Sequence, residues 1–175
     1  MRLIELKDYI VTTDTVALTE IYHPELNTKI YDLNGIYYSK QTMKEILKKS
    51  CDRYGASYQG RIETVRNIFS YWRRTPLMIY PELFLYAFPT KSPEDFTCRW
   101  IFPAHIQTHI IENNHLYVLF KNGMKVELNC SLNTYIKQRE RTAHCLTHYS
   151  VHGPGRDPQN NSTDINGLRF DRWNK

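Results

Sequence analysis

Hydrophobic and polar residues alternate along much of the first forty positions, as they do in β-strands with one face on a core. The alternating segments are residues 9–13, 16–18, 28–32 and 36–38. Asn34-Gly35 separates the last two segments, and Asn-Gly between such runs is a strong signal for a two-residue hairpin. The sequence therefore predicts antiparallel strands at the start of the chain.

From position 43 the apolar residues recur at helical spacing. They share one predicted helix face: Met43, Ile46, Leu47, Cys51 and Tyr54. Thr42 and Glu45 stand three residues apart at the start of this run, which is the pattern of a capping box. Lys40, Lys44 and Lys48 repeat every four residues on the other side. The pattern predicts an amphipathic helix with a basic outer face.

A second helix is predicted after a connection over residues 55–60. Its apolar face is formed by Ile62, Val65, Phe69 and Trp72, and Pro76 ends it. Arg61 and Arg66 lie off that face. The pair Arg73-Arg74 falls at the predicted C-terminus, where basic side chains also interact favourably with the helix dipole. This helix is thus expected to be basic as well.

The remainder of the chain to about residue 150 predicts strands and one more helix. Strands are expected at residues 77–80, 84–88, 98–102 and 106–111, followed by a hairpin of residues 115–120 and 124–128 around Asn122-Gly123. Residues 131–149 are predicted to be helical, with one side made by Leu132, Tyr135, Ile136, Arg139, Ala143 and Leu146. The predicted fold class is α+β, with a largely antiparallel sheet, two basic central helices and a C-terminal helix.

Composition divides the chain into one domain and a tail. A chain of 175 residues with 41% hydrophobic content can bury one sizeable core, which we assign to residues 1–150. Residues 151–175 are rich in Gly, Pro, Asn, Asp and Ser, and such a segment is expected to be flexible. It ends in the apolar stretch 168–173, which would either dock back on the domain or bind a partner.

Charge is distributed unevenly. The net charge is +5, but residues 40–74 alone contain nine lysine and arginine residues against three acidic ones. Concentrated positive charge raises the local potential and attracts phosphate-bearing partners. A solvated helix face without a partner is the alternative explanation.

Signals for other functions are weak. The start of the chain lacks the apolar region of a secretory signal, and no apolar run approaches the roughly twenty residues that cross a bilayer, so a cytoplasmic protein is expected. The four cysteines are widely spaced and are predicted to be reduced. His144, His148 and His152 could share a metal, but no matching cysteine or carboxylate set accompanies them. Without a nucleophile or phosphate-loop signature, we expect no enzyme and no cofactor.

Nucleic-acid binding agrees better with these patterns. Two basic helices around a turn suggest a helix-turn-helix, although the predicted connection of residues 55–60 is longer than that motif uses. A glycine-flanked loop with Tyr58 and Arg61 could instead approach a phosphate chain or place an arginine in a narrow groove. A·T-rich minor grooves have this shape and a strongly negative potential.

Several separated blocks of the sequence resemble the ComK family of competence transcription factors. The central block is Ser50-Cys51, Tyr54-Gly55, Ser57-Tyr58 and Gly60-Arg61, and further blocks are residues 75–79, 88–90 with Ser92, 98–101, 120–123, 127–128, and Gln138 with residues 141–143. The resemblance extends over about residues 5–150 in the same order.

The resemblance implies an activator of genes for DNA uptake, located with the nucleoid. Family members recognise paired A/T-rich boxes through the minor groove and assemble as two homodimers on one promoter. As an activator, the protein would work with RNA polymerase. The resemblance also implies control by the MecA adaptor and the ClpC protease, for which the 168–173 stretch is the candidate recognition segment.

Seven residues are predicted to contribute DNA contacts: Lys44, Lys48, Tyr58, Arg61, Arg66, Arg73 and Arg74. Tyr58 is expected to shape the loop or touch a sugar. Arg53 and Arg61 could instead pair with Asp52 or Glu63 on neighbouring helical turns. The competing function classes are a non-DNA protein-interaction module or adaptor with a basic surface, and a metal-dependent hydrolase that uses His144 and His148.

Overall fold

The larger of two antiparallel sheets has six strands. A computed structural model describes residues 4–151 of the chain. In this sheet the strand order is β3-β2-β1-β6-β5-β4, and every neighbouring pair is antiparallel. The strands are β1 (Thr15–Glu20), β2 (Thr28–Asp32), β3 (Gly35–Ser39), β4 (Leu77–Tyr80), β5 (Leu85–Pro89) and the short β6 (Trp100–Ile101).

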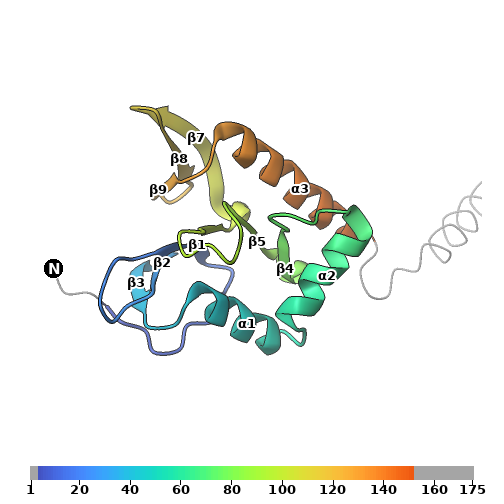
Figure 1. Cartoon of the computed structure of the whole chain (residues 1–175), viewed down its shortest axis with the longest axis horizontal. Helices are drawn as coiled ribbons and strands as arrows, with labels where there is room; N and C mark the ends of the chain where they lie inside the picture. The colour runs from blue at the N-terminus through green and yellow to red at the C-terminus, as the bar shows by residue number, and fades with distance from the viewer. Residues whose placement is uncertain (1–3, 152–175) are drawn as a thin grey trace, which may run out of the picture.

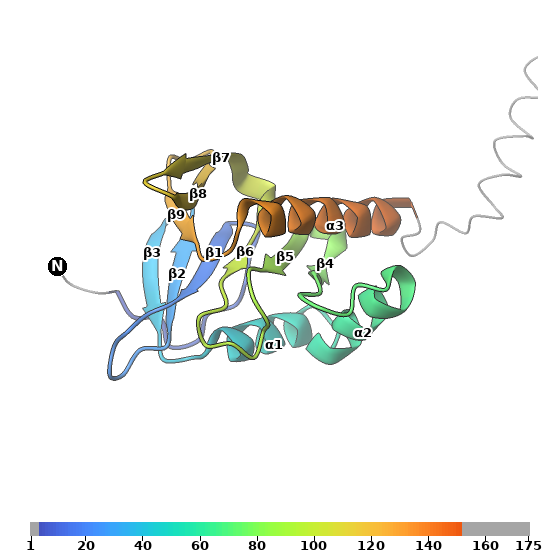
Figure 2. The same ribbon diagram turned by 45° about the horizontal axis from the view of Figure 1, so that its top comes forward.

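Three helices and a smaller sheet cover the two faces of the larger sheet. The helices are α1 (Met43–Arg53), α2 (Tyr58–Phe69) and α3 (Leu132–Val151), and the small sheet has the order β7-β8-β9, with β7 (Ile106–Glu112), β8 (His115–Phe120) and β9 (Lys125–Leu128). Two 3-10 turns, Pro81–Leu83 and Pro103–His105, precede β5 and β7. Figure 1 shows the arrangement, and Figure 2 shows α1 and α2 on one side of the larger sheet with α3 and β7–β9 on the other.

Alternation along the central strands divides the core between these two layers. Leu18 and Trp100 pack with α1 and α2, whereas the adjacent Ala17 and Ile101 pack with β7–β9 and Tyr135 of α3. A third cluster joins α2, β4 and α3 around Val65, Met78 and Cys145. Because successive strand residues face opposite sides of a sheet, one six-stranded sheet supplies both cores.

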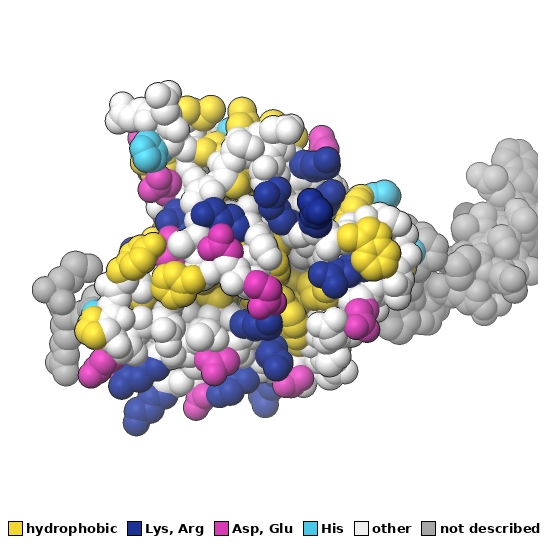
Figure 3. Space-filling view, viewed as in Figure 1, with side chains coloured by type: hydrophobic (Ala, Val, Ile, Leu, Met, Phe, Trp, Pro, Cys, Tyr) yellow, Lys and Arg dark blue, Asp and Glu magenta, His cyan; other side chains and the backbone are white. Residues whose placement is uncertain are grey.

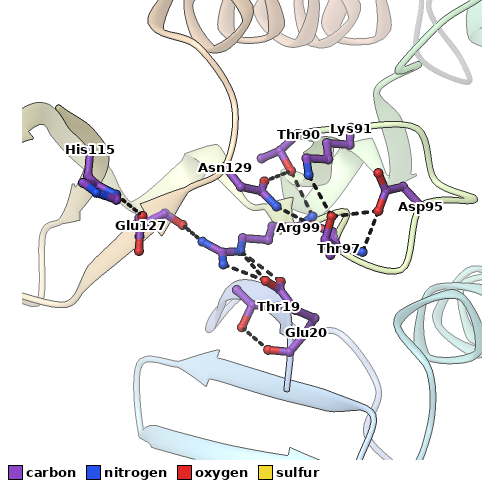
Figure 4. Close-up of polar contacts among 10 residues, drawn as sticks. All are labelled: Thr19, Glu20, Thr90, Lys91, Asp95, Thr97, Arg99, His115, Glu127 and Asn129. Carbon is purple, nitrogen blue, oxygen red and sulfur yellow. Dashed lines mark hydrogen bonds and ion pairs between the residues drawn. The ribbon is translucent and has the colours of Figure 1, made fainter. Parts of the chain in front are cut away.

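A polar network ties the large sheet to β9 (Figure 4). The Arg99 guanidinium donates hydrogen bonds to both carboxylate oxygens of Glu20 and to the main-chain carbonyl of Glu127. The Glu20 side chain is 6% exposed and that of Arg99 is 18% exposed. Thr90 donates to Asn129 at 2.8 Å and accepts from the Arg99 backbone at 3.0 Å. The network therefore fixes β1, β6, β9 and the 90–99 loop together.

The predicted fold class is confirmed, including the antiparallel pairing and the C-terminal helix. Strands at 28–32, 77–80 and 115–120 have the predicted bounds. The hairpin predicted at Asn34-Gly35 also forms, but Gly35 pairs with Asp32 as the first residue of β3, so the two turn residues are Leu33 and Asn34. The strand predicted at 9–13 is wrong. Its backbone bonds to side chains instead: the Tyr9 amide donates to Gln41 and the Val11 amide to Ser50 of α1.

The buried face of α3 differs from the predicted one. Its buried residues are Tyr135, Gln138, Thr142 and Cys145, whereas Ile136 is 42% exposed. Gln138 donates hydrogen bonds across the interface to two main-chain carbonyl groups, and the Thr142 hydroxyl donates to the Gln138 carbonyl within the helix. The spacing of apolar residues therefore did not predict which face of α3 is buried.

Some predictions fall on residues 152–175 and so lie outside the described residues. These are the flexible tail, the 168–173 stretch and the position of His152. Within residues 4–151, no helix is long and apolar enough to cross a membrane.

Candidate nucleic-acid interface

The connection between α1 and α2 consists of residues 54–57, not the predicted 55–60. The capping box of Thr42 and Glu45 begins α1 as expected. Ser57 is the N-cap of α2, because its hydroxyl accepts a hydrogen bond from the Gly60 amide at 2.9 Å. Tyr58 and Gly60 therefore belong to the helix. Gly55 has a φ of 77°, a left-handed conformation that favours glycine in the turn.

Tyr58 lies in the core rather than on a loop surface. Its side chain is 8% exposed, and burial raises its pKa to about 12. This residue is thus placed to support α2, with little area left for a sugar contact. Arg61 is half-buried near Cys51 and Tyr149, and its Nε is buried without a hydrogen-bond partner.

The expected alternative pairings of Arg53 and Arg61 do not form. Within the described residues, no ion pair joins either arginine to Asp52 or Glu63. Glu63 accepts a hydrogen bond from Gln59 instead.

A four-residue connection is compatible with a helix-turn-helix, so the prediction that the connection is too long for this motif was wrong. The charge of α2 disfavours a recognition helix on different grounds. Its exposed side chains are Gln59, Glu63, Thr64, Asn67 and Ile68, while both of its arginines are half-buried. A helix that reads the major groove presents cationic and amide side chains to bases and phosphates. The exposed face of α2 has no cation.

The lysines of α1 are exposed and partly paired. Lys44 forms an ion pair with Glu94 at 2.8 Å, and Lys49 forms one with Asp8 at 2.6 Å. Lys48 is exposed and has no ion pair within the described residues. Exposed ion pairs of this kind contribute at most about 1 kcal/mol, so phosphate could replace the carboxylates.

The segment between α2 and β4, residues 70–76, presents the predicted arginine pair outside any helix; we call it the 70–76 linker. The helix ends at Phe69, because Ser70 has the left-handed φ of 58°. Trp72 was predicted to be a core residue of the helix but is 62% exposed. Arg73 and Arg74 are exposed, and Arg74 has a φ of 50°. Ser70 and Arg74 both adopt the left-handed conformation, which non-glycine residues rarely do, so contacts with the rest of the protein must stabilise the linker backbone.

Side chains of α3 impose that backbone. Arg141 donates a hydrogen bond to the Arg73 carbonyl at 3.0 Å. Gln138, which is 2% exposed, donates to the carbonyl of Arg74 at 2.8 Å and to that of Pro89 at 2.9 Å. The main-chain carbonyl groups of both arginines are therefore held by α3, while the two side chains are exposed to solvent.

Both ends of the linker are held in the same way. Thr75 is buried, accepts a hydrogen bond from Arg66 Nε at 3.2 Å, and donates to the Tyr71 carbonyl at 2.6 Å. Tyr71 stacks on Phe69 at 5.5 Å and lies under the Arg141 guanidinium at 4.7 Å. Arg66 of α2, which was predicted to contact DNA, thus helps to hold the linker through Thr75.

The electrostatic consequence is visible on one face of the molecule. Figure 3 shows lysine and arginine side chains in two groups, one in the middle between α2 and α3 and one below along α1. Within residues 4–151, no ion pair engages the guanidinium group of Arg73 or Arg74. Two unneutralised cations on a fixed backbone are suited to bind phosphate or enter a narrow groove.

His144 and His148 of α3 contact the aromatic residues at the start of the linker. The Tyr71 hydroxyl and His144 Nδ1 are 3.0 Å apart, and Phe69 contacts both imidazole rings, at centroid distances of 5.0 and 5.3 Å. In the part of the chain that the structure describes, no group of three or more His, Cys, Asp or Glu residues could hold a metal.

Periodicity alone did not identify Gln138 and Arg141, although both lie in a block that resembles the ComK family. Comparison with known proteins now establishes this relationship. Residues 6–152 match the family described as ComK protein, so the chain belongs to the ComK family of proteins. The "Competence transcription factor" of Bacillus subtilis (strain 168) is 30% identical over 146 residues, which cover 82% of this chain and 76% of that protein. No solved structure matches the chain.

Proposed function

We propose that this protein is a DNA-binding transcription activator of competence genes. One observation carries the proposal: the 70–76 linker displays Arg73 and Arg74, both exposed and free of ion pairs among the described residues, on a backbone held by Gln138 and Arg141. The similarity to the Bacillus subtilis competence transcription factor supplies the biological role.

We also propose that recognition takes place through the minor groove of paired A/T-rich boxes. A·T tracts have a narrow minor groove with an enhanced negative potential, into which arginine inserts without base-specific hydrogen bonds. The linker offers two adjacent, exposed arginines, whereas both arginines of α2 are half-buried and its exposed side chains have no positive charge. This contrast favours groove shape over direct base readout.

Affinity would come from the lysines of α1 as well as from the arginines in and beside the linker. Lys44 and Lys48 on α1 are proposed to contact phosphate, and Arg61 to contribute through the exposed part of its half-buried side chain. Arg66 and Tyr58 are proposed to act indirectly, since one holds Thr75 and the other is buried. Phosphate contacts of this kind position a protein and make its binding sensitive to salt.

The assembly and partners are proposed from the family. The chain would act at the nucleoid as homodimers, with two dimers on one promoter, and would work with RNA polymerase. Its abundance would be controlled by the MecA adaptor and the ClpC protease.

Mobility shifts at one fixed salt concentration test the proposal. The full chain should bind a duplex with two A/T boxes more tightly than a G/C-rich duplex of equal length. Arg61→Ala and Arg73→Ala/Arg74→Ala should each weaken binding to the A/T duplex. A protein-interaction module with a merely basic surface would bind both duplexes alike, and equal affinities would reject the proposal. If both variants bound as tightly as the parent, the assignment of this face would be wrong.

A further inference from the structure

The most exposed tryptophan of the described residues lies directly beside the arginine pair. Trp72 is 62% exposed, whereas Trp100, the other described tryptophan, is 2% exposed. Tryptophan is a highly buried residue type on average, so a mostly exposed indole on a fixed segment is unusual. Ile68, in the last turn of α2, is also 45% exposed.

The linker holds Trp72 in place from both sides. Tyr71, the preceding residue, contacts both the Phe69 ring and the Arg141 guanidinium. Arg73, the following residue, has its carbonyl bound by the same Arg141. The backbone on each side of the indole is therefore fixed before any ligand binds, which lowers the entropic penalty of a contact.

We infer that Trp72 is a DNA-contacting residue whose indole enters the groove beside Arg73 and Arg74 and stacks at a base step as an apolar wedge. This inference rests on the proposed DNA-binding function. Minor-groove proteins commonly combine basic side chains with an apolar wedge that partly unstacks a base step. The linker places both kinds of group on three consecutive residues, so one ligand would satisfy them together. A protein partner would have to bury two unpaired guanidinium groups along with the indole, which is unfavourable without matching carboxylates.

Tryptophan fluorescence can test the inference on the full chain. Trp173→Phe serves as the parent, because the sequence has three tryptophans and this change leaves Trp72 and Trp100. Addition of the A/T-box duplex is expected to protect the exposed tryptophan from acrylamide quenching. The same titration of a parent that also carries Trp72→Phe should lack the quenchable component, which assigns the signal.

Binding of two further variants separates the wedge from the charges. Trp72→Ala is expected to weaken binding to the A/T duplex about tenfold or more, the scale of one lost aromatic stack. The salt dependence should stay unchanged because no cation is lost. Arg73→Ala/Arg74→Ala should instead make the salt dependence shallower. Circular dichroism checks that each variant is folded, and the quenching experiment on the parent needs no change at Trp72.

Three results would overturn the inference. If Trp72→Ala binds as the parent does while the arginine variant is weakened, DNA binding stands and the wedge does not. If the indole is already shielded in the free protein and DNA adds no protection, another part of the chain covers it. If the parent binds no duplex, the proposed function fails and the wedge fails with it.

Discussion

Replacing Arg73 and Arg74 with alanine gives a quantitative test of the proposed role of the linker in DNA binding. Both side chains are exposed and neither forms an ion pair within residues 4–151, so the free energy of unfolding should change by less than about 0.5 kcal/mol. Arg74 has a φ of 50°, and alanine tolerates this conformation no worse than arginine does. The fold should therefore survive, and any loss belongs to binding.

The loss can be estimated from electrostatics. If each arginine contacts one phosphate, the slope of log K against log salt should become shallower by about 0.9 per contact, or about 1.8 for the pair. A contact at about 4 Å in water is worth about 1 kcal/mol, so two contacts correspond to about 30-fold in affinity at moderate salt. Fluorescence anisotropy with a labelled A/T-box duplex over a range of salt concentrations measures both quantities.

A matched control removes the same charge elsewhere. Lys7→Ala/Lys121→Ala also deletes two exposed cations that form no ion pair within the described residues. This variant should retain most of the affinity and the slope of the parent. Equal effects of the two double variants would refute the linker's special role, because binding would then depend on net charge alone.

Three other predictions concern stability, measured by urea unfolding. Gln138→Leu removes the hydrogen-bond donor of the Arg74 and Pro89 carbonyl groups at a buried site, so the free energy of unfolding should fall by about 3 kcal/mol. An unchanged value would contradict the role of Gln138 in holding the linker. Glu20→Ala leaves the part-buried Arg99 unpaired and should cost about 3 kcal/mol, whereas Glu25→Ala on the surface should cost less than about 1 kcal/mol; equal losses would be inconsistent with this account. Burial raises the pKa of Cys51 from 9.0 to about 11, so this thiol keeps its proton in the folded state while unfolded chains ionise. The parent should be compared with a Cys51→Ala variant, because burial also raises the pKa of Cys98 and Cys145 and both titrate equally in the two proteins. The stability of the parent relative to this variant should be constant below pH 9 and fall by about 1.4 kcal/mol per pH unit between pH 9 and 11, and a constant difference throughout would argue against a buried thiol.

Local signals predicted much of the fold. The Asn34-Gly35 hairpin and the capping box at Thr42 depend on residues close in sequence, and both were confirmed. The end of α2 depends instead on long-range contacts. Helical periodicity continued through Trp72, but the α3 side chains Gln138 and Arg141 bind the linker carbonyls and hold it in a different conformation. A pattern within one segment contains no information about such a clamp.

The candidate site shows the same division. The charge distribution identified Arg73 and Arg74, and the structure leaves both exposed. The predictions for two aromatic residues were the reverse of what the structure shows. Tyr58 was expected at the surface and is buried, while Trp72 was expected in the core and is exposed. The cause was a pair of misplaced helix ends, since α2 begins at Tyr58 and stops at Phe69. Boundary errors of a few residues are therefore enough to place a buried residue at the surface and an exposed residue in the core.

Replacing the A·T pairs of the two boxes with inosine·cytosine pairs tests the central claim most directly. Inosine lacks the guanine amino group, so an inosine·cytosine pair resembles A·T in the minor groove and G·C in the major groove. The account predicts that the full chain binds the inosine·cytosine duplex nearly as tightly as the A/T duplex, and binds the G·C duplex much more weakly. Binding to inosine·cytosine as weak as binding to G·C would contradict minor-groove recognition by the linker.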